Sequence, residues 1–180
     1  FGTWVLKQGS WLYIYGTNED VVDGFHHKYM ILARVAENRL SEFDQWRFYV
    51  KGSWSPDFAE AERLCAGMAN EYSVSYLPSL EEFIVVYNEN GISRNIVARF
   101  ASHPWGPWRR PMNLYQCPEM SRGKDFLCYA AKAHPELSIA PNELIITYVA
   151  NSTDFYKMAA DARLYRPRFI RVRFEKAENK

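Results

Sequence analysis

A motif that occurs twice constrains the fold of this chain more than any other feature of its sequence. The motif reads Tyr-x5-Pro-x-Leu and covers residues 72–80 and again residues 129–137. Each copy is followed by a short apolar run that ends in tyrosine, and then by a run that carries an inset arginine. These runs are 83–87 and 96–100 after the first copy, and 144–148 and 169–174 after the second. Such self-similarity predicts a fold built from repeated structural units.

The repeat extends to the start of the chain, because the tyrosine and the arginine both recur there. The tyrosines are Tyr15, Tyr87 and Tyr148, and the arginines are Arg34, Arg99 and Arg171. The period is therefore about 60 to 70 residues, with loops of varying length. Within each unit, the alternation of apolar and polar residues with a period of two predicts short β-strands.

Strands are predicted in all three units, and two of the connections between them are expected to be polar loops. They cover 1–8, 11–15, 29–36 and 45–50, then 72–77, 82–87, 94–101 and 108–115, and last 127–134, 143–149 and 168–174. We expect polar loops over 18–27 and 151–165 and a long connection over 53–70. Four antiparallel strands per unit leave apolar sheet faces open, and radial stacking of the units covers them. The sequence therefore predicts an all-β fold, a β-propeller of four-stranded antiparallel blades.

The expected blades cover residues 1–54, 71–117 and 126–174, with a connection over 55–70, and the last blade lacks its fourth strand. About three blades are too few for a propeller, which typically has roughly four to eight. We therefore expect missing N-terminal blades or a second chain to complete the ring. A two-sheet sandwich is the alternative, although it does not readily explain why one strand order recurs. In a further alternative, copies of the chain pair their open sheet edges.

Composition excludes several classes of function. The formal net charge is +1, so there is no basic excess to drive nucleic-acid binding, and no apolar run approaches the roughly 20 residues that span a membrane. The three cysteines lack zinc-site spacing, and Cys117 and Cys128 are either bridged or free thiols. No Gly-rich phosphate loop occurs, and no cofactor is expected.

The chain starts at Phe1 without methionine or signal peptide, and we expect it to be a piece of a longer protein.

Several phrases along the chain resemble those of a long uncharacterised bacterial family of five-bladed β-propellers. The phrases lie at 11–17, 32–35, 73–76, 98–108, 133–138 and 165–172. That family is similar to the arabinanase, levansucrase and invertase superfamily, and some of its relatives are endo-D-arabinanases. The resemblance covers nearly the whole chain, as the last three of five blades. Its phrases are moderately specific for the fold and weakly specific for activity.

The resemblance implies a carbohydrate-active protein, a glycoside hydrolase acting on a polysaccharide or oligosaccharide outside the cell or in the periplasm. A non-catalytic propeller that binds glycans or a protein is the alternative. Glycosidases of the superfamily carry their carboxylates on the inner strands of blades one to three. The first two blades are absent here, and residues 1–8 contain no Asp or Glu. The catalytic pair therefore cannot be carried over onto this chain, and most of it is expected on the missing blades.

Strand order assigns the loops to two faces of the propeller. One face collects the longest polar segments, 18–27, 55–71, 88–93, 118–125 and 151–165, and long loops on a rigid scaffold are where sites usually lie. Glu71 precedes an innermost strand there and is the candidate catalytic carboxylate, with a solvated loop residue as the alternative. The candidate sugar-binding residues are Ser73, Ser75, Lys132, Asp154 and His27. Ser73 and Ser75 also have a packing explanation, because the propeller axis is crowded.

Other tempting residues are assigned structural roles. The pair His134 and Glu136 lies at a turn on the opposite face, and Trp105 and Trp108 are expected to pack between blades. Arg34 and Arg99 recur in the repeat and are expected to form ion pairs between blades. Asp161 is placed at the rim of the site. His26, His27, Asp20 and Asp23 are the only candidate metal ligands, and a Gly-flanked loop of this kind is more typical of solvent-exposed residues, so no metal site is expected.

Overall fold

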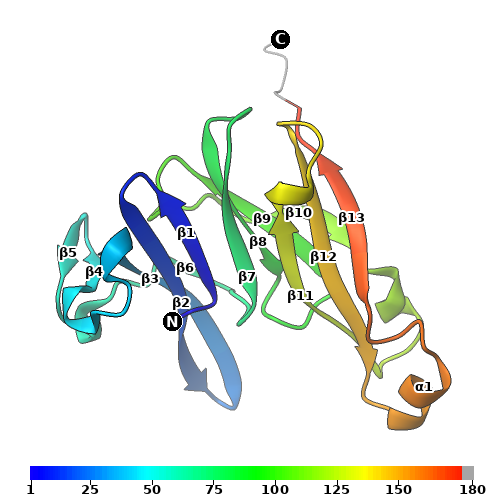
Figure 1. The fold of residues 1–180 in the computed structure, drawn as a ribbon. Helices are drawn as coiled ribbons and strands as arrows, with labels where there is room; N and C mark the ends of the chain where they lie inside the picture. Colours follow the sequence, from blue (N-terminus) through cyan, green and yellow to red (C-terminus); the bar gives the residue numbers. More distant parts are fainter. Residues whose placement is uncertain (176–180) are drawn as a thin grey trace.

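The computed structural model describes residues 1–175 and shows an all-β chain built from three antiparallel sheets (Figure 1). The sheets follow one another along the sequence. They contain six, four and three strands. The links between sheets and the connection 153–166 lie at one end of the sheets, whereas the turns 9–10, 78–81 and 135–142 lie at the opposite end. The prediction of an all-β fold with antiparallel pairing is confirmed.

The first sheet has the order β1-β2-β3-β4-β5, and β6 pairs with β3. Its strands are β1 (Trp4–Gln8), β2 (Trp11–Val22), β3 (Phe25–Ala36), β4 (Arg47–Val50), β5 (Ser53–Ser55) and β6 (Cys65–Ala66). Single 3-10 turns occur at η1 (Glu37–Arg39), η2 (Phe43–Gln45) and η3 (Phe58–Glu60).

The second and third sheets have the orders β10-β9-β8-β7 and β11-β12-β13. The second contains β7 (Tyr72–Leu77), β8 (Glu82–Asn88), β9 (Asn95–Ala101) and β10 (Met112–Gln116). The third contains β11 (Phe126–His134), β12 (Glu143–Ser152) and β13 (Pro167–Arg173). Around these strands lie η4 (Pro118–Ser121), η5 (Pro135–Leu137) and one short helix, α1 (Phe155–Ala160).

The middle sheet is buried on both faces, which divides the core in two. Successive side chains of a strand point to opposite faces, and β8 uses this alternation. Val85 and Tyr87 pack in the cluster shared with the first sheet, whereas Ile84 and Val86 pack in the cluster shared with the third. All four are almost completely buried, which explains why consecutive residues of β8 are apolar.

Two tyrosine hydroxyls join the first sheet to the second. The Tyr15 hydroxyl donates to the Pro104 carbonyl at 2.9 Å, and the Tyr72 hydroxyl donates to the Gly16 carbonyl at 2.7 Å. Both rings are fully buried, and burial raises the pKa of both phenols well above the ordinary value. Trp105 packs in the same cluster and stacks on Tyr49 of β4, with ring centroids 5.9 Å apart. The expected packing of this tryptophan between repeat units is confirmed.

Polar groups also join the second sheet to the third, and one of them corrects a prediction. The Ala133 amide of β11 donates to the Ser73 hydroxyl of β7 at 2.7 Å. Ser73 is fully buried and Ser75 is nearly so. Their expected role in binding a sugar is wrong, because β11 covers this side of β7. The packing explanation for these small side chains holds instead.

The polar stretch 18–27 is a hairpin rather than a loop. Strands β2 and β3 continue pairing as far as Val22 and Phe25. Asp23 and Gly24 form the turn, with φ of 52° and 77°. A two-residue turn with both φ values positive matches the right-handed twist of paired strands, which is why Asp-Gly favours it. The structure thus replaces a predicted loop with a projecting two-stranded arm.

Two other predicted connections contain short elements. In the stretch expected to be a long connection, β5 pairs with β4, η3 forms a turn, and β6 adds to the edge of β3. The stretch 151–165 contains α1. Asp154 caps this helix by accepting hydrogen bonds from the amides of Tyr156 at 3.0 Å and Lys157 at 3.3 Å. Side-chain capping of the first free amides stabilises a helix that is too short to form by propensity alone.

The two repeated arginines do not form the expected ion pairs. The Arg34 guanidinium lies 4.0 Å from the centre of the Trp54 ring and 4.4 Å from that of Trp11. Arg99 donates to the Tyr87 hydroxyl at 2.7 Å and to the Ala66 carbonyl at 2.8 Å. Within residues 1–175, neither arginine has a carboxylate partner. Aromatic faces and carbonyl oxygens, rather than carboxylates, stabilise these two charges.

Asn88 provides a test of the contact between the second and third sheets. Its side chain is fully buried, accepts from the Ala131 amide at 2.9 Å and donates to the Ser93 carbonyl at 3.1 Å. Asn88→Ala should lower the free energy of unfolding by about 1 to 3 kcal/mol, because the buried Ala131 amide loses its acceptor. Urea denaturation measures the change. Asn113→Ala, at an exposed position of β10, is the matched control and should cost much less. Equal losses would contradict the role of Asn88.

Candidate functional site

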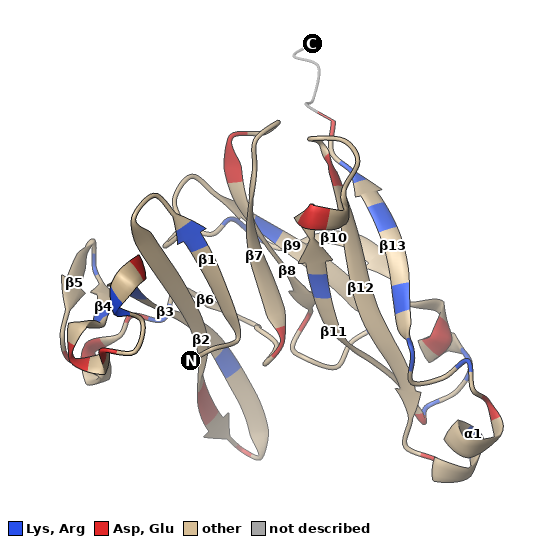
Figure 2. Ribbon diagram, viewed as in Figure 1, with Lys and Arg blue, Asp and Glu red and all other residues tan. Residues whose placement is uncertain are grey.

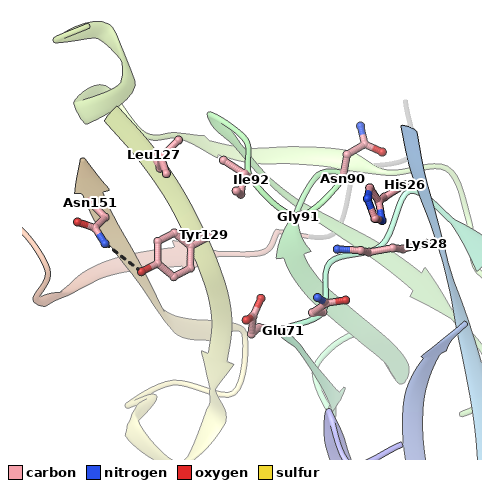
Figure 3. A pocket seen from close by; sticks show the side chains of 10 residues that line it. His26, Lys28, Glu71, Asn90, Gly91, Ile92, Leu127, Tyr129 and Asn151 are labelled. Atoms are coloured by element: carbon pink, nitrogen blue, oxygen red, sulfur yellow. Dashed lines mark hydrogen bonds between the residues drawn. The ribbon is translucent and has the colours of Figure 1, made fainter. Parts of the chain in front are cut away.

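A pocket of about 560 Å³ opens at the end of the sheets where the links between the sheets lie (Figure 3). It is lined by His26, Lys28, Asn70, Glu71, Asn90, Gly91, Ile92, Leu127, Tyr129 and Asn151. These residues come from all three sheets: from β3, from the approach to β7, from the turn between β8 and β9, and from β11 and β12. The pocket therefore depends on the packing of the sheets against one another.

Glu71 is the one carboxylate among the lining residues. It is partly exposed and immediately precedes Tyr72, whose buried ring fixes the start of β7. No hydrogen bond or ion pair to the Glu71 side chain occurs within residues 1–175. Both carboxylate oxygens are thus available to a ligand. The predicted catalytic residue does lie in the pocket.

The wall formed by the third sheet carries a phenol and an amide. The Asn151 side-chain amide donates to the Tyr129 hydroxyl at 3.4 Å, as Figure 3 shows. This contact uses an acceptor site of the hydroxyl and leaves its proton free to be donated into the pocket. Leu127 adds apolar surface two residues before Tyr129 on the same face of β11.

The wall formed by the first two sheets carries a cation and a tight turn. The Lys28 side chain is about one-fifth exposed, and its ammonium lies 3.9 Å from a Glu19 oxygen, too far for a hydrogen bond. Asn90 and Gly91 turn the chain with φ of 57° and 96°. A Cβ on Gly91 would lie 3.9 Å from the Lys28 Nζ, and the positive φ favours glycine there. The turn therefore holds the Asn90 amide at the mouth of the pocket, next to a cation.

Most of the other residues proposed from the sequence lie outside this pocket. His27 is exposed on the β2–β3 hairpin and points away from the face that carries His26 and Lys28. Lys132 places its ammonium 5.6 Å from the centre of the Trp4 ring. Asp154 caps α1, and its side chain has no place in the pocket. The structure therefore brings together Glu71 and residues that the sequence reasoning missed.

Four of the missed residues carry most of the polar chemistry: Lys28, Asn90, Tyr129 and Asn151. Tyr129 had a signal in the sequence, because it opens the second copy of the repeated motif, as Tyr72 opens the first. Asn90 and Asn151 lie in polar segments that were assigned to the expected site face but were not singled out, and Lys28 had no signal. They belong to different repeat units and meet only when the sheets pack.

Two of the four candidate metal ligands, His26 and Asp20, are engaged in pairs. His26 Nδ1 lies 2.7 Å from a Glu19 oxygen, and Asp20 forms a bidentate pair with Arg63. The hydrogen bond from Arg63 lowers the pKa of the Asp20 carboxyl below its ordinary value. Of residues 1–175, no three His, Cys, Asp or Glu side chains converge as a metal site would require.

The His134 and Glu136 pair lies at the opposite end of the third sheet. His134 Nδ1 is 3.1 Å from a Glu136 oxygen, and its Nε2 is 2.8 Å from the Thr147 hydroxyl on the adjacent strand. The ring thus bonds across the β11–β12 ladder, as a structural residue would. Its partners are the side chains of Glu136 and Thr147.

The pocket offers the groups that bind a hydroxyl-rich ligand. Glu71 accepts hydrogen bonds, Lys28 and Tyr129 donate them, and the amides of Asn90 and Asn151 do both. Ile92, Leu127 and the Tyr129 ring supply apolar contact. One carboxylate is not enough for glycosidic bond cleavage, which uses two.

In the described part of the chain, no helix has the length and hydrophobicity to cross a bilayer.

A solved structure with a similar fold comes from Bacteroides. It is a crystal structure of a "putative hydrolase" from Bacteroides ovatus ATCC 8483, with a TM-score of 0.69 and 21% sequence identity. The match covers 92% of this chain and 43% of that chain. The chain therefore spans less than half the length of the Bacteroides ovatus protein. At this identity the likeness concerns the fold alone.

Two further solved structures are more distant. An α-L-arabinofuranosidase from Clostridium thermocellum ATCC 27405 matches with a TM-score of 0.45 and 10% identity, over 95% of this chain and 55% of that one. A GH43 protein from Bacillus licheniformis matches with a TM-score of 0.36 and 11% identity, over 84% of this chain and 37% of that one. These TM-scores are too low to support an argument about this chain.

No curated protein matches the chain. One family model does, over residues 1–175, and it is described as "Domain of unknown function (DUF5005)". That match extends from the first strand of the first sheet to the end of β13, and so includes every residue of the pocket. The chain belongs to the DUF5005 family.

Proposed function

We propose that this chain is part of a carbohydrate-active β-propeller and that the pocket around Glu71 binds a sugar. The observation that carries the proposal is an unpaired carboxylate facing neutral amides, a phenol and an ammonium in a pocket of about 560 Å³. Pockets for small ligands typically measure roughly 300 to 1,000 Å³. This one has room for one or a few sugar units.

The chemistry of the pocket matches that of a sugar ring. Ring hydroxyls both donate and accept hydrogen bonds, and Glu71, Asn90 and Asn151 provide partners for both roles. The Tyr129 ring and Leu127 offer surface for the C–H face of the sugar. A carbohydrate uses this mixture more fully than a purely apolar or a highly charged ligand would.

For catalysis, we propose that Glu71 is one member of a carboxylate pair. The two carboxyl groups of a glycoside hydrolase lie roughly 5 to 9.5 Å apart across the scissile bond. The pocket lining within residues 1–175 contains a single carboxylate. The second would come from other blades, either elsewhere in a longer protein or on a second chain.

Non-catalytic glycan binding is the second candidate, and one observation favours it. A single carboxylate among the lining residues is sufficient for recognition but not for hydrolysis. The two candidates differ in what Glu71 does. In an enzyme it acts in the transition state, whereas in a binding protein it contributes to affinity alone.

We further propose that the three sheets are three blades of a five-bladed propeller. Support comes from the recurring strand order and from apolar surface left open on the first sheet. Phe1, Phe43 and Phe58 form part of an aromatic cluster there and are 44%, 75% and 53% exposed. Another blade would cover this cluster, because contiguous exposed apolar patches generally mark a contact surface.

The site of action is also a proposal. Polysaccharides are too large and too polar to cross a membrane unaided, so a protein that acts on them would be extracellular or periplasmic. Fractionation of cells that express the complete protein, followed by detection with an antibody, would test this. Recovery of the protein in the cytoplasm alone would contradict the assignment.

Glu71→Gln should weaken sugar binding by roughly tenfold or more, because a hydrogen bond to a charged group is worth about 1.5 to 3 kcal/mol. Titration calorimetry with arabino-oligosaccharides and related sugars measures the affinity. Glu136→Gln, exposed at the opposite end of the third sheet, is the matched control and should leave it unchanged. Wild-type protein that binds no sugar, or a Glu71→Gln variant that binds normally, would refute the sugar site.

The same variant in the complete protein separates the two candidates. If Glu71 takes part in proton transfer, Glu71→Gln should lower kcat by about a hundredfold or more on a cleaved polysaccharide. If the protein only binds glycans, neither form releases reducing sugar, and only the affinity changes.

Sizing and intact-mass measurement of protein purified from its natural source tests the propeller. We expect residues 1–180 to elute together with further blades, either in one longer polypeptide or in a second one. A folded monomer of 180 residues alone would contradict the five-bladed arrangement.

A further inference from the structure

A second pocket, rich in arginine, lies between η4 and the segment that leads into β13. It measures about 480 Å³ and is lined by Pro118, Glu119, Arg122, Arg163, Arg166 and Arg168. Figure 2 marks Lys and Arg positions in blue along β13 and in the segment before it. The pocket shares no residue with the Glu71 pocket.

One of the four arginines is fixed as part of the wall. Arg168 places its Nε 2.6 Å from a Glu119 oxygen, and its terminal nitrogens donate to the carbonyls of Arg166 at 3.2 Å and Arg163 at 2.9 Å. The Tyr148 hydroxyl donates to Glu119 at 3.1 Å. The Glu119 charge is therefore compensated within the protein, so it does not dominate the pocket.

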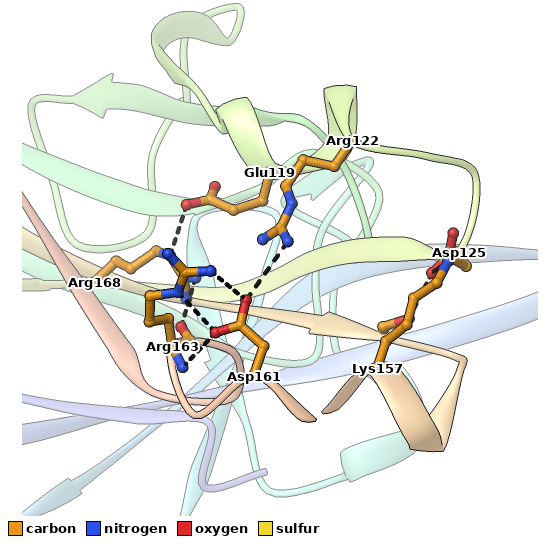
Figure 4. A network of polar contacts seen from close by, with 8 residues as sticks. Glu119, Arg122, Asp125, Lys157, Asp161, Arg163 and Arg168 are labelled. Atoms are coloured by element: carbon orange, nitrogen blue, oxygen red, sulfur yellow. Dashed lines mark hydrogen bonds and ion pairs between the residues drawn. The ribbon is translucent and has the colours of Figure 1, made fainter. Parts of the chain in front are cut away.

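Asp161 holds two further arginines together. Arg163 pairs with both of its oxygens, at 2.8 and 3.1 Å, and Arg122 approaches the same carboxylate to 3.6 Å. Figure 4 shows the two guanidinium groups converging on Asp161. The hydrogen bonds from Arg163 hold the pKa of Asp161 well below its ordinary value, so this carboxylate stays charged. It positions the two arginines side by side.

The charges around the pocket do not balance. Four arginines face two carboxylates, Glu119 and Asp161, which leaves a formal excess of two positive charges (4 − 2 = 2). Arg166 is exposed, and its guanidinium has no hydrogen bond or ion pair within residues 1–175. Arg122 and Arg163 are also accessible, with 46% and 76% of their side chains exposed. Three guanidinium groups thus offer free N–H donors to one pocket.

We propose that this pocket binds a doubly charged phosphate group, either on a phosphorylated sugar or as the free ion. Guanidinium groups bind phosphate oxygens through parallel N–H donors, which gives geometric specificity as well as charge. A dianion matches the excess of two positive charges. The volume lies within the range of small-molecule sites, so the pocket has room for the sugar as well as the phosphate. This proposal does not depend on the Glu71 pocket.

Titration calorimetry at low ionic strength, with glucose 6-phosphate and with inorganic phosphate, tests the proposal on the whole chain. We expect glucose 6-phosphate to bind with the same affinity when excess glucose is present, because the phosphate group rather than the sugar is recognised in this pocket. The singly charged glucose 6-sulfate should bind more weakly than the phosphate ester. If inorganic phosphate binds more weakly than glucose 6-phosphate, the preferred ligand is the phosphorylated sugar. If the two bind equally, the preferred ligand is the free phosphate ion.

Arg166→Ala should weaken binding of glucose 6-phosphate by roughly tenfold to a hundredfold, because it removes a charged donor. Arg122→Ala provides a second variant, with far-UV circular dichroism to confirm that it is folded. Arg39→Ala on η1 is the matched control and should bind normally. Wild-type protein that binds neither phosphate, or an Arg166→Ala variant that binds as tightly as wild type, would overturn the proposal. Equal losses in Arg39→Ala would overturn it as well.

Discussion

The packing of β7 against β11 is the contact on which the rest of the structure depends. Ser73 of β7 and Ala131 and Ala133 of β11 are completely buried, so the two strands approach closely. The hydrogen bond from the Ala133 amide to the Ser73 hydroxyl satisfies groups that have no access to water. A larger side chain on either strand would separate the second and third sheets. That separation would open the pocket, because Glu71 and Tyr129 lie on its two sides.

A bulge in β11 ties the site to this contact. The register between β11 and β12 shifts between Tyr129 and Lys132, and Ala130 has a φ of 58°. Asn88 inserts at the same place and accepts the hydrogen bond of the Ala131 amide. Bulges commonly redirect a side chain, and this one begins at the tyrosine that faces Glu71. A buried amide in the core thus helps to position a polar group in the pocket.

The repeat in the sequence was sufficient to predict the order of the longer strands, and β7 was predicted with its correct ends, whereas β5 and β6 were missed in the expected connection. The projecting hairpin was missed, although Asp23 and Gly24 form a known turn pair. Its polar residues and two histidines concealed the alternation of the strands. Helix α1 was missed because six residues are too few for a helical period to stand out. Glu71 was proposed from its position just before β7, and it does line the pocket. Its partners come from three sheets, and spatial convergence of that kind leaves no local pattern.

The concentration of both pockets at one end follows from antiparallel topology. Successive connections alternate between the two ends of a sheet, so the second-to-third connections share one end with the links between sheets. At the other end the first and second strands join by short turns, such as the one beside His134. Long connections tolerate changes in length and composition because they lie outside the core. Amides, carboxylates and arginines can therefore vary at that end while the strands stay packed. At the opposite end, Trp105 packs in the core, and His134 bonds across the β11–β12 ladder.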